Sequence, residues 1–234
     1  MRGMRDFVRN LPVFAGLSER DLDDLLREMQ IVRYAKGAAV FEQGEPARSF
    51  FLLQQGHLRV VKVTPEGRQV VVRYVVPGDI FGVAMAFGRD TYPATAAAVA
   101  ESVSLVWPSA AWPRLVNRYP QLAMNTLHAV GGRLYEAHDR VVEASTERVE
   151  LRVAHALLRL AAQSPSQTRI ELPVSRQDLA EMAGTTLFTV SRILKSWQGR
   201  GFVISGRQRV TVLDVGALRA LAGEGRSMDD EPGR

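Results

Sequence analysis

Apolar and polar positions follow a strand-like pattern in the first half of the chain, between residues 32 and 107. Short β-branched runs are separated there by four glycines at intervals of 12, 11 and 11 residues: Gly44, Gly56, Gly67 and Gly78. This spacing is typical of antiparallel strands in a jelly roll or barrel. The clearest hairpin joins segments 57–63 and 68–76 through a Thr-Pro-Glu-Gly turn. The pattern therefore predicts a β-roll.

Helical spacing of apolar residues replaces this pattern on both sides of the strands. Within residues 11–31, Ser18 and Asp21 match a capping box, which predicts the start of a helix. Residues 110–118 predict a short helix that ends before Pro120. A long helix is then predicted from Gln121 to about Thr146.

The predicted long helix carries an apolar seam on an otherwise polar surface. Leu127, Leu134 and Val141 lie seven residues apart, and Val130 lies between the first two. The pair Gly131-Gly132 would weaken the helix by about 1 kcal/mol per glycine, which is tolerable if another backbone approaches closely. The seam packs either on the helix's own domain or on the same helix of a second subunit.

The pattern near the C-terminus predicts a winged helix-turn-helix. A helix over residues 176–182, capped by Ser175, is followed by a turn at Gly184 and by a second helix that runs to Trp197. Residues 202–212 predict a β-hairpin with arginines at its tip, which is the wing. Ahead of this motif the pattern predicts a helix, a polar loop and a short strand, at residues 148–163, 164–168 and 170–172.

The second helix of this motif has an outward side made of hydroxyl and basic residues. Arginine can donate two hydrogen bonds to guanine, hydroxyls reach bases or phosphates, and lysine holds phosphates. Bases are expected to be read by Ser191 and Arg192, with three neighbours close by: Thr186, Phe188 and Thr189. Phosphate contacts are expected from five further side chains: Arg176, Gln177, Lys195, Arg207 and Arg209. The alternative for this segment is a plain helical hairpin with a solvated face.

Positive charge is concentrated in the same part of the chain. Of the net charge of +5 over 234 residues, residues 148–222 carry +6, residues 1–147 carry +1 and residues 223–234 carry −2. A basic excess in one compact region is expected of a nucleic-acid-binding domain. The acidic tail has no apolar anchors, and we expect it to be disordered.

The composition excludes several kinds of chemistry. A hydrophobic content of 46% and a charged content of 24% are those of a globular chain. The absence of cysteine excludes disulfides, thiol nucleophiles and cysteine-bound iron–sulfur clusters. No apolar run is long enough to span a membrane and no signal peptide is recognisable, so we expect a cytoplasmic protein with no membrane partner.

The four histidines show no spacing typical of metal ligands, and only His57 lies among the predicted strands. A cupin-like ligand-binding module with a C-terminal interaction domain is the alternative interpretation of the chain. A cupin enzyme, however, needs clustered histidine and glutamate ligands within its strands. We therefore expect no enzyme activity and no metal site, and His57 is a weak candidate for holding a cofactor.

Several segments resemble the cyclic-AMP-receptor/fumarate-nitrate-reductase (CRP/FNR) superfamily of transcription regulators. Residues 174–184 and 189–195 resemble its winged helix-turn-helix. The segments similar to its β-roll sensor are 37–47, 50–56, 65–67, 77–82 and 92–95. The resemblance covers about residues 11–222, in the family's order.

The resemblance implies an α+β fold with three parts. These are a β-roll sensor domain, a dimerisation helix and a winged helix-turn-helix DNA-binding domain, at residues 1–118, 119–147 and 148–222. It assigns the apolar seam to a homodimer and implies a palindromic double-stranded operator, with RNA polymerase as a further partner if the protein is an activator.

Details within the superfamily separate its branches. Cyclic-nucleotide binders carry Gly-Glu and, further on, Arg-Ser or Arg-Thr, where this chain has Gly82-Val83 and Pro93-Ala94. The resemblance therefore implies no cyclic AMP, because a buried phosphate without a cation is costly. Segments 88–94, 152–160 and 184–187 resemble the nitrogen-oxide-responsive (NnrR-like) branch. That likeness leaves two alternatives open: haem in the β-roll, or a sensor without a small ligand.

One position departs from the family's pattern. Many members carry a glutamate three residues before the serine of the Ser-Arg pair, where it accepts a hydrogen bond from a cytosine. This chain has Phe188 at that position. An aromatic ring cannot accept that bond but can contact a thymine methyl group. The sequence therefore does not predict the identity of the operator base pair that faces Phe188.

Overall fold

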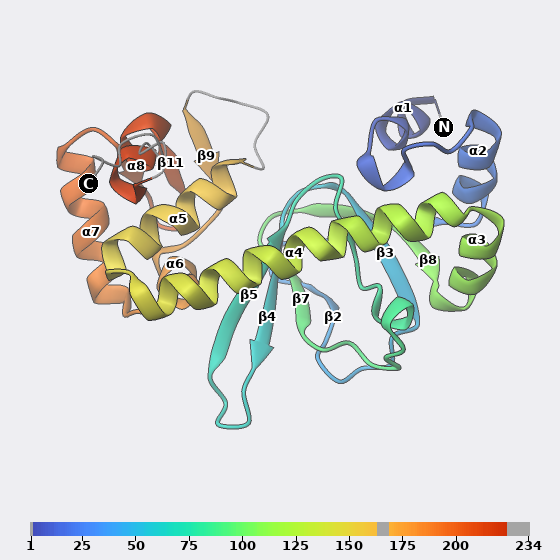
Figure 1. Cartoon of the computed structure of the whole chain (residues 1–234), viewed down its shortest axis with the longest axis horizontal. Helices are drawn as coiled ribbons and strands as arrows, with labels where there is room; N and C mark the ends of the chain where they lie inside the picture. The colour runs from blue at the N-terminus through green and yellow to red at the C-terminus, as the bar shows by residue number, and fades with distance from the viewer. Residues whose placement is uncertain (1, 163–168, 224–234) are drawn as a thin grey trace, which may run out of the picture. The chain divides into compact units, whose positions relative to one another are not determined.

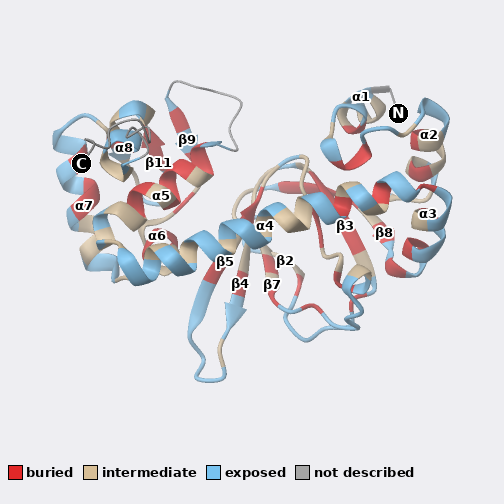
Figure 2. Cartoon of the chain, viewed as in Figure 1, coloured by how far each residue is buried: buried red, intermediate tan, exposed pale blue. Residues whose placement is uncertain are grey.

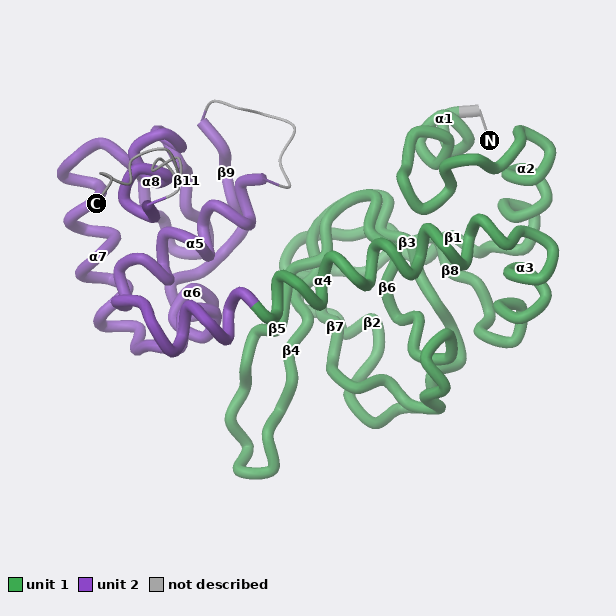
Figure 3. Tube along the Cα trace, viewed as in Figure 1, with its two compact units in different colours: residues 1–138 green, residues 139–234 purple. Residues whose placement is uncertain are grey.

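The structure, a computed structural model, describes residues 2–162 and 169–223. The chain divides into two compact units, residues 1–138 and 139–234 (Figure 3). The loop expected at residues 164–168 and the tail from residue 224 lie outside the described residues. None of the described helices is both long enough and apolar enough to cross a membrane.

Two four-stranded antiparallel sheets form the body of the first unit (Figure 1). One sheet has the order β1 (Gln30–Tyr34), β8 (Ser102–Pro108), β3 (Ser49–Gln55) and β6 (Ile80–Phe81). The other has the order β2 (Ala39–Phe41), β7 (Thr95–Ala98), β4 (Leu58–Val63) and β5 (Gln69–Val75). The hairpin of β4 and β5 is the one that the glycine spacing predicts, and Gly67 N donates to Thr64 O at 2.9 Å across its turn.

Successive residues of β3 point into two different cores, because side chains alternate between the two faces of a strand. Phe50 and Leu52 pack with Trp107 beneath the helices, whereas Phe51 and Leu53 pack between the sheets. Both faces of β3 are therefore shielded from solvent, which explains why its apolar residues follow one another in the sequence without alternating polar positions. Figure 2 shows β3 buried over most of its length.

Short helices and most of one long helix, which continues into the second unit, complete the first unit. They are α1 (Arg2–Arg9), η1 (Pro12–Phe14), α2 (Glu19–Arg27), η2 (Ala84–Phe87), η3 (Ser109–Ala111), α3 (Trp112–Arg118) and the long α4 (Pro120–Thr146). The predicted capping box is present at α2, where Ser18 Oγ accepts from Asp21 N at 3.2 Å and the Asp21 carboxylate accepts from Ser18 N at 3.1 Å. The predicted helix over residues 110–118 begins only at Trp112, after a 3-10 turn.

The second unit packs four helices around a small antiparallel sheet. The helices that follow α4 are α5 (Val149–Ala162), α6 (Arg176–Met182), α7 (Leu187–Gly199) and α8 (Val215–Ala222). The sheet has the order β10 (Val203–Ser205), β11 (Val210–Val212) and β9 (Ile170–Leu172). The helix-turn-helix and the wing thus lie where the sequence predicts them. The sequence analysis did not predict α8. The α+β fold class is confirmed.

Candidate nucleic-acid interface

The turn between α6 and α7 is fixed by two helix caps and one glycine. Ser175 Oγ accepts from Asp178 N at 3.1 Å at the start of α6, and Thr186 Oγ1 accepts from Thr189 N at 3.2 Å at the start of α7. Between the helices, Gly184 adopts a φ of +58°, which glycine reaches without steric cost. The sequence positions of these residues therefore set the geometry of the helix-turn-helix.

Arg152 of α5 holds this turn in place. Its Nε donates to Ala183 O at 2.9 Å, its Nη2 to Gly184 O at 3.5 Å, and its Nη1 to Glu147 O at 2.7 Å. The guanidinium thereby satisfies carbonyls at a helix end, which have no partner within their own helix. Sequence reasoning missed this role, since nothing in the local pattern links Arg152 to a turn about thirty residues away.

The two faces of α7 differ sharply in exposure. Its inner face consists of buried apolar side chains: Val190, Ile193, Leu194 and Trp197. Trp197 also donates from Nε1 to Glu150 Oε1 at 2.9 Å. The inner face therefore docks α7 firmly on its own unit and leaves the opposite face free for a partner.

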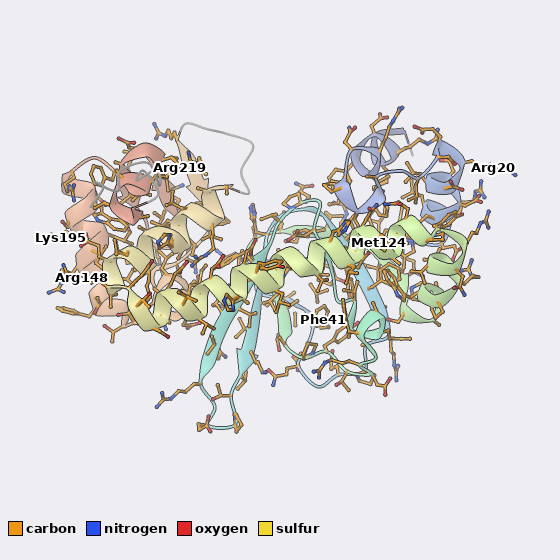
Figure 4. All side chains as sticks on the ribbon, viewed as in Figure 1. Arg20, Phe41, Met124, Arg148, Lys195 and Arg219 are labelled. Carbon is orange, nitrogen blue, oxygen red and sulfur yellow. The ribbon has the colours of Figure 1, made fainter. Side chains whose placement is uncertain are left out.

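The outer face of α7 presents an exposed row of side chains. Phe188, Arg192 and Lys195 are spaced four and three residues apart, so they lie along one side of the helix. Phe188 is 78% exposed, the highest value among the exposed large apolar side chains of the described residues. Lys195 lies at the surface of the second unit (Figure 4). Of the neighbouring predicted residues, Thr186 is exposed, whereas Thr189 and Ser191 are half-buried.

Hydrogen bonds connect the wing to both helices of the motif. Arg176 donates from Nε to Ser205 Oγ at 3.0 Å, and Gln198 Oε1 accepts from Ser205 N at 3.2 Å. Arg176 is half-buried, and its Nε is engaged with Ser205. The structure assigns it a second task, which is to position the wing.

The remaining predicted phosphate contacts are exposed. Arg207 lies at the tip of the wing, and Arg209 pairs with Glu171 at 3.4 Å while both side chains stay largely solvent-exposed. Gln177 donates to Glu181 Oε1 at 2.9 Å. Such exposed contacts are weak, so a phosphate can replace the carboxylate partner at little cost.

A second site lies in the β-roll, where a cavity of about 280 Å³ opens between the strands, η2 and α4. Gly82, Val83, Pro93 and Ala94 all line it, so the four residues that stand where relatives carry a nucleotide clamp do meet in space. Gly82 has a φ of +68°, and a side chain there would collide with the ring of Phe51.

The position of His57 does not suit a cofactor in this cavity. His57 is half-buried, burial lowers its pKa from the usual value, and no histidine belongs to the described lining of the cavity. The sequence left open whether His57 is simply exposed, and in the structure it is not. A haem held in the cavity through His57 does not fit the residues present.

The long helix α4 also has two unlike faces. Leu122 and Thr126 are buried against the first unit, whereas Leu127, Leu134 and Val141 are 54%, 70% and 66% exposed. Val130, predicted as part of the seam, is half-buried and also lines the cavity. Further apolar side chains that the sequence analysis did not single out are exposed on the same helix: Met124, Tyr135 and Val142.

Comparisons with known proteins match both units. A cyclic nucleotide-binding domain model matches residues 31–119, and a Crp-like helix-turn-helix domain model matches residues 151–221. The transcriptional regulator LdrP of Thermus thermophilus is 31% identical over 196 residues, which cover 82% of this chain and 96% of LdrP. The cyclic AMP receptor protein of the same species is 28% identical over 92% of this chain and 98% of its own length.

The solved structure of FixK2 from Bradyrhizobium japonicum shares the fold, with a TM-score of 0.74 and 24% identity over 82% of this chain and 96% of FixK2. Sensor β-roll, long helix and winged helix-turn-helix therefore occur together, in the family's order, over most of the chain. The chain belongs to the CRP/FNR family of DNA-binding transcription regulators.

Proposed function

We propose that the protein acts as a homodimer that binds a palindromic operator through α7, and that it controls genes of nitrogen-oxide or anaerobic respiratory metabolism. The observation that carries the dimer is the exposed apolar seam of α4. Exposed apolar patches on one helix face mark interaction sites, and heptad spacing fits a twin helix. Gly131 has no atom within 4 Å of an added Cβ, so a partner backbone has room to approach there.

Base recognition is proposed for the outer face of α7. Arg192 is exposed in mid-helix, where its guanidinium can donate two hydrogen bonds to a guanine, and Ser191 lies beside it. Phe188 supplies an apolar contact suited to a thymine methyl group. The phosphate backbone around this contact would be held by five side chains: Arg176, Gln177, Lys195, Arg207 and Arg209. RNA polymerase is a further partner if the regulator activates transcription.

Cyclic nucleotides are not proposed as ligands, although one relative is a cyclic AMP receptor protein. Three cations do line the cavity, Arg73, Arg89 and Arg133, so the expectation that a phosphate would find no cation is wrong. What the described lining lacks, apart from the Tyr92 hydroxyl, is a side-chain acceptor for the ribose hydroxyls or the adenine amine. The hydroxyl of Tyr92, the one hydroxyl in that lining, is engaged with the backbone of Ser49, at 2.7 and 3.1 Å. Buried donors without acceptors cost about 1–3 kcal/mol each.

Cyclic AMP and cyclic GMP are therefore expected to bind no more tightly than about 1 mM, an affinity of only about 4 kcal/mol. Isothermal titration calorimetry on the full chain measures this directly. The matched control is Val83→Glu, which restores a carboxylate at the position where cyclic-nucleotide binders carry one. Micromolar affinity of the unmodified protein for either nucleotide would contradict the proposal.

The nitrogen-oxide branch rests on sequence segments that resemble it, and gene expression tests it. In the source organism, exposure to nitric oxide should change the transcription of genes that carry the operator, and deletion of the regulator should abolish that response. Complementation with the unmodified gene should restore it, whereas Arg192→Ala should not. An unchanged response in the deletion strain would assign the regulator to another signal.

A further inference from the structure

Two arginines in the cavity of the β-roll share a single carboxylate. Arg73 of β5 donates from Nη1 to Asp79 Oδ2 at 3.0 Å, and Arg133 of α4 lies with Nη2 3.6 Å from Asp79 Oδ1. Arg133 also donates to Ile80 O at 2.6 Å. Both guanidinium groups line the cavity, and their side chains are only 18% and 20% exposed.

This arrangement leaves an excess of positive charge in a confined space. Asp79 pairs with both guanidinium groups, and the carboxylate of Glu136, outside the lining, also acts on Arg133. Arg89, a third cation, stands at the exposed edge of the lining. No aspartate or glutamate belongs to the described lining itself. Burial, and secondarily repulsion by Arg73, lowers the pKa of Arg133 to about 10. The environment of Arg133 thus disfavours its charge, and an anion in the cavity would relieve that cost.

One part of the cavity wall is aromatic, since Phe41, Phe81 and Tyr92 belong to the lining. Phe41 stacks on Tyr92 with ring centroids 3.8 Å apart and lies 6.1 Å from the ring of Phe81. Figure 4 labels Phe41 within the β-roll. Because the Tyr92 hydroxyl is engaged with Ser49, this wall offers ring surface rather than polar groups. It suits a flat apolar group.

We propose that the cavity binds small aromatic monocarboxylates, with the carboxylate on Arg73 and Arg133 and the ring against Phe41, Phe81 and Tyr92. Every charged group of the lining is a guanidinium, which can only donate hydrogen bonds. The cavity therefore favours a ligand whose polar group only accepts hydrogen bonds, as a carboxylate does. A cavity of about 280 Å³ is sized for a compact organic acid.

The site deepens the proposed function, because Arg133 belongs to the helix that carries the dimer seam. A carboxylate that binds Arg133 competes with Asp79 for the same guanidinium, so ligand binding and the anchoring of α4 to the β-roll are linked. This regulatory part rests on the proposed function. The binding of the ligand does not rest on the proposed function, so experiments can refute either one without the other.

Calorimetric titration of the full chain with 2-naphthoate tests the site, and its neutral isostere 2-naphthamide serves as the ligand control. Binding of 2-naphthoate in the submillimolar range is expected, with the amide at least about tenfold weaker, because charge-assisted hydrogen bonds to arginine are lost. Arg133→Gln and Arg73→Gln should each weaken 2-naphthoate binding by about tenfold or more and leave the amide unchanged. The matched control is Arg68→Gln, an exposed arginine that does not line the cavity.

The outcomes separate the explanations. Equal affinity for the acid and the amide, or no detectable binding of 2-naphthoate by the unmodified chain, would overturn the proposal. Because the acid and amide are compared on the unmodified chain, the test stands even if a variant fails to fold. Tight binding of 2-naphthoate in a protein that binds no operator would sustain the site and refute the proposed function.

Discussion

Leu134→Asp should turn the protein into a folded monomer that no longer holds its operator. Leu134 is 70% exposed in the middle of the seam, and in a dimer its copy faces it across the two-fold axis. Two carboxylates buried there cost desolvation and repel each other, on the order of several kcal/mol per dimer. Losing the second half-site contact should weaken operator binding by about 100-fold or more. Sedimentation velocity and a binding titration measure the two effects.

Val70→Asp provides the matched control for this variant. Val70 is an exposed apolar residue on β5 of the same unit and lies outside the seam. Replacing this apolar side chain by aspartate should therefore leave the dimer intact. Circular dichroism should show both variants folded. If Leu134→Asp sediments as a dimer and binds the operator normally, the seam has no part in assembly.

Arg192→Ala should lose about 1–3 kcal/mol of operator binding per half-site contact, because a bidentate contact to guanine discriminates by that amount. Operators in which the contacted guanine is replaced should then bind the variant no more weakly than the original operator. Competition titration with both operators measures this. Equal binding of the unmodified protein and Arg192→Ala to the operator would exclude a base contact by this residue.

Lys195→Ala distinguishes a phosphate contact from a base contact on the same helix face. It should weaken binding to all sequences alike and reduce the slope of log affinity against log salt by about one per subunit. Arg192→Ala is its matched control, since that variant should change sequence preference instead. A change in sequence preference caused by Lys195→Ala would reverse the two assignments.

Local signals account for most of what the sequence could predict. The capping residues Ser18 and Ser175, the turn at Gly67 and the left-handed position Gly184 act within a few residues of the chain, so their effects can be recognised in the pattern. The overlooked α8 had such signals as well, with Asp214 as its N-cap and a left-handed glycine after its end.

Elements that depend on distant contacts could not be predicted in this way. α1 is strongly charged, and it is held by Val8, which is fully buried in the core, and by the ion pair of Arg5 with Asp23. The cavity also depends on contacts between residues that are distant in the sequence. Asp79 and Arg133 are 54 positions apart in the sequence, and only the packing of α4 on the β-roll brings them together. Sequence spacing carries no trace of such a cluster.

Selection of bound fragments from a random library of duplex DNA tests the central claim most directly. A dimer that places α7 of each subunit in successive major grooves should enrich two inverted half-sites with centres about 10 base pairs, or about 34 Å, apart. The same selection with Arg192→Ala should lose the preference for one guanine in each half-site. Enrichment of a single unrepeated half-site, or of no sequence at all, would contradict a dimeric regulator that reads DNA through α7.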